Sequence, residues 1–167
     1  MRRFLVVHDY GMGGLWWWVW ATSPEDILET IAEVEVITDE ATIREMGPLA
    51  EEELHLDALS GTSLADLRDQ RTAHRSLPGY GALAGRDRVY LREDEDQTIT
   101  FVELGPDGRR LREVIVTPHG AFRLANDLPN PPRDLRDPRY SQLEITHLEF
   151  EAAWKRSLPY PEDEEHP

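Results

Sequence analysis

The chain has 167 residues, 40% hydrophobic and 31% charged, which is the composition and length of one globular domain. Eighteen basic and 33 acidic residues give a net charge of -15, which excludes the broad basic face needed for nucleic-acid or anionic membrane binding. With no cysteine, disulfides, thiolate metal sites and cysteine nucleophiles are excluded as well. We therefore expect a soluble, cytoplasmic protein that binds neither nucleic acid nor membrane.

The first elements predicted along the chain form a β-hairpin. Apolar, β-prone runs at 4–7 and 15–21 flank a loop at 9–14 that is rich in residues tolerating positive φ. In the second strand, Trp16, Trp18 and Trp20 share one face, and the other face is also apolar. This strand is therefore covered on both sides or keeps an aromatic face for a partner.

A helix follows, with clear start signals. Ser23 can cap it, Pro24 suits the first helical position, and two acidic residues favour the positive end of the helix dipole. An apolar stripe at helical spacing continues it: Ile27, Leu28, Ile31 and Ala32. Further predictions are a short strand at 35–37 and helices at 39–46 and 62–75, with an ambiguous acidic stretch that includes 51–53.

The third segment is predicted to be an antiparallel meander after a loop at 76–85. Its expected strands lie at 88–92, 98–104, 110–117 and 121–124. The run 93–96 reads as a solvated acidic turn. Pro106 and Gly108 suit a tight turn between the second and third strands, which makes this the best-defined hairpin.

The C-terminal part begins with a connector at 128–138 that contains four prolines. Thr146 and Glu149 form a capping box for a last helix that continues to Trp154. Helices and strands do not alternate, so we predict an α+β fold with a mainly antiparallel sheet, made of the N-terminal hairpin and the later meander, and helices packed on it. One domain is expected over 1–158, followed by a disordered acidic tail at 159–167.

Two stretches resemble a group of small bacterial domains: VELGPDGRRLREV at 102–114 and LEITHLEFEAAW at 143–154. In that group an Asp-Gly hairpin precedes a short capped helix that ends in tryptophan. The opening HDYGMGGLWWW at 8–18 is similar to hypothetical proteins common in actinobacteria. Some such domains are encoded near toxin genes, so the resemblance implies an immunity-type role. It transfers no catalytic residue.

The candidate site is the first hairpin, where titratable groups adjoin a large aromatic surface, as in many ligand pockets. Its candidate binding residues are His8, Asp9, Tyr10, Gly11, Gly13, Gly14, Trp16, Trp18 and Trp20. The glycines lack the following helix and the lysine of a phosphate loop, so a flexible hairpin loop is the preferred interpretation. No catalytic residue, metal site or cofactor is predicted, because neither the six histidines nor the serines show a recognisable spacing.

Three hypotheses follow. The leading one is an acidic protein-binding module of immunity, inhibitor or accessory type, without catalysis, that attracts a basic protein partner. The alternative is a small-molecule-binding protein or minor enzyme with its site at His8, Asp9, Tyr10 and the tryptophan strand. The third is a homo-oligomer held together by the tryptophan face. A cleft where His8 or Asp9 meets distant polar groups would favour the alternative, and a flat acidic face would favour the first.

Overall fold

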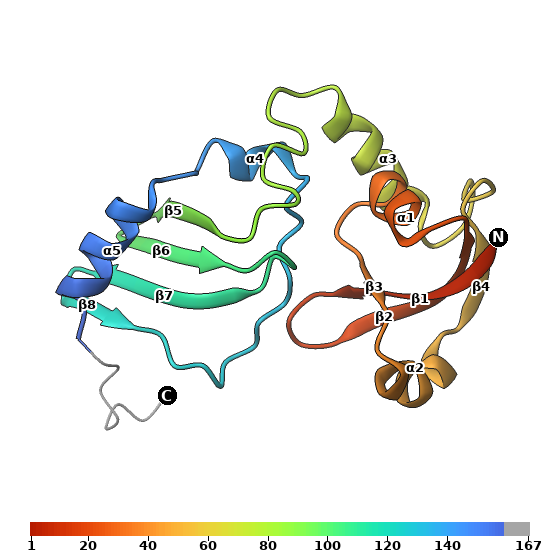
Figure 1. Cartoon of the computed structure of the whole chain (residues 1–167), viewed down its shortest axis with the longest axis horizontal. Helices are drawn as coiled ribbons and strands as arrows, with labels where there is room; N and C mark the ends of the chain where they lie inside the picture. Colours follow the sequence, from red (N-terminus) through yellow and green to blue (C-terminus); the bar gives the residue numbers. More distant parts are fainter. Residues whose placement is uncertain (159–167) are drawn as a thin grey trace.

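Two four-stranded sheets, each with helices packed on it, make up the protein (Figure 1). A computed structural model of the chain describes residues 1–158, so the predicted disordered tail at 159–167 lies outside the described residues. Sheet A has the order β3-β1-β2-β4 and sheet B the order β5-β6-β7-β8. The α+β class is confirmed, and the predicted hairpin and meander are the centres of two separate sheets.

The strands of sheet A are β1 (Arg2–Asp9), β2 (Gly14–Ala21), β3 (Glu35–Ile37) and β4 (Glu52–His55). Those of sheet B are β5 (Val89–Glu95), β6 (Thr98–Leu104), β7 (Arg110–Thr117) and β8 (Gly120–Arg123). The helices are α1 (Pro24–Thr30), α2 (Glu40–Met46), α3 (Ala65–Arg75), α4 (Pro138–Ser141) and α5 (His147–Arg156), with a 3₁₀ turn η1 (Gly47–Leu49) after α2. No helix among residues 1–158 is long and apolar enough to cross a membrane.

One face of sheet A is the larger hydrophobic core. The β1–β2 register places alternate apolar residues of both strands on this face, where the first helix, capped by Ser23 as predicted, and α3 cover them (Figure 1). The buried residues of this core are Phe4, Val6, Trp17, Val19, Ala21, Ile27, Ile31, Leu59 and Leu64. Burial on this scale supplies the main driving force for folding this half.

The opposite face of sheet A carries the other three tryptophans, all half-buried. The Trp18 Nε1–H donates to the Gly47 carbonyl oxygen at 3.2 Å, so η1 covers the middle of this face. The Trp20 Nε1–H donates to Glu53 at 2.6 Å. This face is therefore covered at Trp18, while Trp16 borders a hollow and Trp20 contacts the neighbouring strand β4.

Sheet B packs α5 against one face and a smaller apolar cluster against the other. Tyr90 in β5 contacts Phe150 of α5, with 5.4 Å between the ring centroids, and Arg112 lies 4.8 Å from the same Phe150 ring. The cluster on the second face consists of Leu83, Val89, Leu91, Val102, Leu104, Leu135 and Tyr140. The Thr146–Glu149 capping box of α5 is present as predicted.

The structure corrects the predicted turn at 93–96 and defines two segments that the sequence left without a helix or strand. The acidic run 93–96 is not all turn. The backbone of β5 pairs with β6 as far as Glu95 and Thr98, so the strand includes the first three residues of the run. The ambiguous stretch around 51–53 contains β4, which pairs with β2 in parallel. The proline-rich connector ends in the short helix α4, which Asp137 caps by accepting a hydrogen bond from the Arg139 amide.

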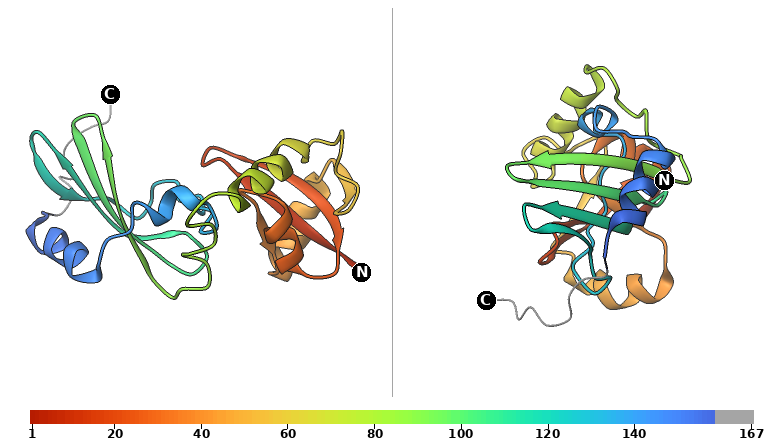
Figure 2. Two further views of the ribbon diagram at one scale, coloured as in Figure 1. Left: turned by 90° about the horizontal axis from the view of Figure 1, so that it is seen from above. Right: turned by 90° about the vertical axis from the view of Figure 1, so that its left-hand side faces the viewer.

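The two sheets have separate hydrophobic clusters and lie side by side along the long axis, with α4 between them (Figure 2). Ion pairs nevertheless connect the halves. Arg136 contacts Glu25 and Glu29 of α1, and Arg109 forms a bidentate pair with Glu35 of β3 at 2.7 and 2.9 Å. The expectation of a single domain over 1–158 stays a prediction.

Candidate site between the two sheets

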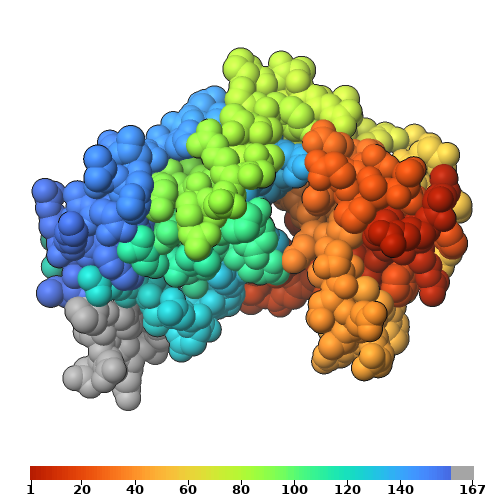
Figure 3. All heavy atoms as spheres, viewed as in Figure 1, coloured from red at the N-terminus to blue at the C-terminus, as the bar shows by residue number. Residues whose placement is uncertain are grey.

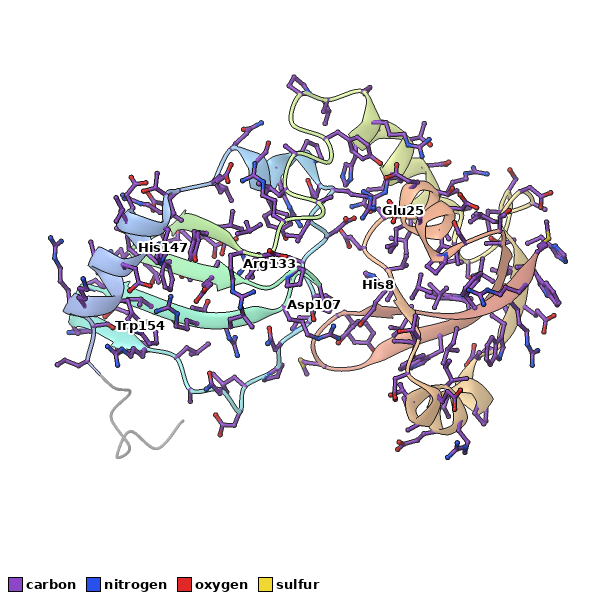
Figure 4. All side chains as sticks on the ribbon, in the orientation of Figure 1. His8, Glu25, Asp107, Arg133, His147 and Trp154 are labelled. Carbon is purple, nitrogen blue, oxygen red and sulfur yellow. The ribbon has the colours of Figure 1, made fainter. Side chains whose placement is uncertain are left out.

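A cavity of about 320 Å³ lies where the end of the first hairpin meets sheet B. The space-filling view is hollowed between the two halves (Figure 3), and His8 and Arg133 lie on opposite sides of the space between the sheets (Figure 4). The lining residues come from β1 and its loop, the turn after α1, β7, the proline-rich connector and α4. They are His8, Asp9, Tyr10, Glu33, Arg110, Glu113, Pro129, Asn130, Pro131, Pro132, Arg133, Asp134, Arg139 and Tyr140.

The sheet A wall is held in place around Glu33. This residue has a φ of 55°, a left-handed conformation that is rare for a residue with a side chain and is often found at functional sites. Its amide donates to the Asp134 carboxylate at 2.9 Å, and its side chain accepts from Gln70 at 2.7 Å. Asp134 also accepts from the buried Arg71 at 2.7 Å. The strained turn is therefore fixed by contacts from both halves.

His8 is oriented by the same turn. Its Nδ1 lies 2.7 Å from the Glu33 carbonyl oxygen, and because a carbonyl oxygen only accepts, Nδ1 carries the proton. In the neutral ring, Nε2 is then left as a hydrogen-bond acceptor. The neighbouring Asp9 accepts the Gly11 amide with Oδ1 at 2.8 Å. Tyr10 is 57% exposed at the rim.

The opposite wall is an arginine and tyrosine cluster. The guanidinium carbons of Arg133 and Arg139 lie 5.7 and 4.7 Å from the centroid of the Tyr140 ring. The Tyr140 hydroxyl accepts from Arg139 at 3.0 Å, and burial raises the pKa of Tyr140. A guanidinium pair beside a buried aromatic ring is an arrangement that binds planar anionic groups.

The floor of the cavity contains an ion pair between Arg110 and Glu113. Glu113 of β7 is largely buried, and this burial raises the pKa of its carboxyl although Arg110 and Arg133 oppose the shift. Arg110 contacts Glu113 at 3.2 Å. The Asn130 side chain makes two hydrogen bonds with the Arg110 backbone, both of 2.8 Å. Its Oδ1 accepts from the Arg110 amide, and its Nδ2 donates to the Arg110 carbonyl oxygen.

The connector segment that carries Arg133 is held against the turn between β6 and β7. The Arg133 amide donates to the Gly108 carbonyl oxygen at 2.9 Å. Gly108 has a φ of +80°, and a Cβ at this position would lie 2.0 Å from the Arg133 carbonyl oxygen. Only glycine fits both requirements, so the Asp-Gly turn predicted from the sequence also positions the cavity wall.

The nine predicted site residues are distributed over both faces of the hairpin. His8, Asp9 and Tyr10 line the cavity. A second hollow of about 570 Å³ lies on the side of the hairpin that faces α2. Asp9 borders this hollow too, together with four more of the nine predicted binding residues: Gly11, Gly13, Gly14 and Trp16. Trp18 packs under η1, and Trp20 stacks on His55 with 6.0 Å between the centroids. The structure thus brings three of the nine, His8, Asp9 and Tyr10, together with the distant polar groups of the first cavity.

Most of the lining was not predicted from the sequence. Arg133, Asp134, Arg139 and Tyr140 lie in or just after a proline-rich stretch that reads as a plain connector. The available signal was the density of polar and charged residues between its prolines, since a connector that lines a site often carries such residues. Glu33 had no local signal, because its backbone conformation is imposed by contacts with residues far along the chain.

Among residues 1–158, no group of three histidines or carboxylates is arranged to hold a metal ion. No protein-family model matches the chain, and neither a curated protein nor a solved structure is similar enough to match it.

Proposed function

We propose that this protein binds a small polar molecule in the cavity between its two sheets. The observation that carries the proposal is the convergence of His8 and Asp9 from β1 with Arg133, Arg139 and Tyr140 from more than a hundred positions later in the chain. At about 320 Å³, the cavity is at the lower end of the range for small-ligand sites. The ligand is accordingly small.

The chemistry of the lining supports binding as the function. A strained residue held by hydrogen bonds, a histidine of fixed orientation and a buried carboxyl with a raised pKa are features of preorganised sites. We propose no catalytic step.

The acidic protein-binding module is the second candidate, and the charge distribution favours it. Most arginines are engaged in ion pairs with carboxylates, so the excess acidic charge that gives the net charge of -15 remains uncompensated. Such a surface attracts a basic protein, and the attraction weakens as salt rises. An immunity-type role belongs to this candidate.

Native mass spectrometry of the full chain, purified gently from the cells that produce it, separates the two candidates. We expect a small-molecule adduct that is reduced in His8→Ala and retained in His119→Ala, a matched change in the exposed β7–β8 turn. Equal melting temperatures of the two variants would show that His8→Ala loses the adduct through the change in the site and not through loss of stability. A stoichiometric protein partner, lost at high salt, with no small-molecule adduct would replace our proposal with the second candidate.

A further inference from the structure

The cavity walls differ in the charges that they leave available. On the sheet B side, Arg133 uses only Nη1, in its pair with Glu93, and Arg139 contacts Asp137 through Nε and Tyr140 through Nη2. Among the described residues, Nε and Nη2 of Arg133 and Nη1 of Arg139 donate no hydrogen bond to the protein. Both guanidinium groups have a carboxylate neighbour, Glu93 or Asp137, and this wall still keeps free guanidinium donors.

The sheet A side has the opposite character. Glu33 accepts from Gln70 with Oε1, and Asp9 accepts from the Gly11 amide with Oδ1, so each carboxylate keeps a second oxygen without a partner in the part of the chain that the structure describes. The acceptor Nε2 of His8 adds to this side. This wall therefore offers negative charge and free acceptors.

The two walls influence each other without closing into an ion pair. The pKa of Arg139 is raised: burial opposes this shift, and the Tyr140 hydroxyl and the charges of Asp137 and Glu33 outweigh it. Glu33 and Arg139 both line the cavity, yet within residues 1–158 the two form no ion pair. A pair of opposite charges held apart across a cavity is complementary to a molecule that carries both charges in the reverse order.

We propose that the ligand is a small zwitterion of the α-amino acid type, with its carboxylate at Arg133 and Arg139 and its ammonium group at Glu33 and Asp9. This inference rests on the proposed function and specifies its ligand class. Guanidinium groups bind carboxylates through paired hydrogen bonds, and an ammonium group has three donors for the free carboxylate oxygens and for Nε2 of His8. The rings of Tyr140 and Tyr10 and the connector prolines leave apolar surface for a side chain.

The first test uses an equimolar mixture of the twenty L-amino acids and the full chain, with ligand-observed saturation-transfer NMR. The amino acid with the strongest signal is then titrated by calorimetry beside its N-acetyl form, which lacks the ammonium, and its carboxamide, which lacks the carboxylate. We expect each modified form to bind at least about tenfold more weakly, which corresponds to about 1.4 kcal/mol. Absence of binding by every amino acid, or equal binding of either modified form, overturns the inference.

Variants assign the two ends. Arg139→Gln should weaken the amino acid about tenfold and remove most of the preference over the carboxamide; Glu33→Gln should do the same for the preference over the N-acetyl form. The Arg139 side chain is 62% exposed, so this variant is expected to fold. Arg44→Gln and Glu45→Gln in α2 make the same charge changes at exposed positions and should leave the affinity unchanged. Equal affinities in all four variants would contradict the assignment.

The failure of this inference is distinguishable from that of the proposed function. If native mass spectrometry finds an adduct of a molecule with only one of the two charges, the cavity binds a ligand and the zwitterion is wrong. If no adduct is found and no amino acid binds, both are wrong.

Discussion

Sheets A and B have the same number of strands but bury different chemistry. The core of sheet A is apolar, and Val6, Val19, Ile27 and Ile31 are fully buried there. Sheet B carries charges within its strands, for example Glu103 beside Arg112, and it is covered by α5 partly through arginine–aromatic contacts. The cavity combines both halves, since its free carboxylate oxygens lie on the sheet A side and the guanidinium groups that face them lie in the connector and α4.

The largest effect expected from this difference is in the core of sheet A. Ile31→Ala should lower the free energy of unfolding by about 2–5 kcal/mol, because the side chain is fully buried and its removal leaves a cavity. Urea denaturation measures this change. Leu111→Ala in β7, where the side chain is 42% exposed, should stay within about 0.5 kcal/mol. Similar losses in both variants would contradict the fully buried position of Ile31.

The turn that supports the cavity gives the second prediction. Gly108 and Gly85 have φ values of +80° and +75°, but only Gly108 faces a backbone oxygen, since a Cβ at Gly85 meets open space. Both alanine variants should be destabilised because alanine is strained at positive φ. Gly108→Ala should lower the free energy of unfolding by about 1–3 kcal/mol more than Gly85→Ala.

Thermal denaturation of the two glycine variants measures this difference. The Gly108 variant should also lose the small-molecule adduct, because the Arg133 segment must move away from the turn. An unchanged adduct with equal stabilities would show that Gly108 does not position the wall.

The α5 interface of sheet B should be weaker than the core of sheet A. Trp154 is half-buried, with the guanidinium carbons of Arg123 and Arg112 at 4.1 and 4.9 Å from its ring. Trp154→Ala should therefore cost about 1–2 kcal/mol, less than for a fully buried tryptophan. Leu148→Ala on the exposed side of the same helix is the control and should have almost no effect in urea denaturation. If Trp154→Ala lowered the free energy of unfolding as much as Ile31→Ala does, the α5 interface would stabilise the protein as strongly as the core of sheet A.

The smallest effect expected is the pH dependence of the contact between the two halves. The pKa of Glu29 is lowered, first by the hydrogen bond from Arg136, against burial, and then by the Tyr80 hydroxyl. A lowered carboxyl pKa stabilises the folded state above the ordinary value of 4.5, and this contribution is lost as pH falls through the folded pKa. The melting temperature of Glu29→Gln should therefore lie below that of wild type at pH 7 and approach it at pH 3.

Glu45→Gln is the control for this measurement, because Glu45 is exposed in α2. Its difference from wild type should be close to zero at both pH values. A constant difference between Glu29→Gln and wild type over the whole range would contradict the role of the Glu29 carboxylate.

The sequence by itself determined most of the local elements. Ser23, the Thr146–Glu149 capping box and the turn at Gly108 make contacts within a few residues, so their chemistry can be recognised in a short window. The spacing of apolar residues likewise predicted β1, β2, β6 and β7, because each lies in a sheet with a buried face.

Only the tertiary structure decided how these elements combine. The parallel pairing of β4 with β2, the separation of hairpin and meander into two sheets and the wall around Glu33 depend on contacts between distant residues. Asp134, for example, receives hydrogen bonds from Arg71, 63 positions away, and from the Glu33 amide, 101 positions away. Such pairings leave no periodic or local signal, and the charges that face each other across the cavity therefore became visible only in the folded chain.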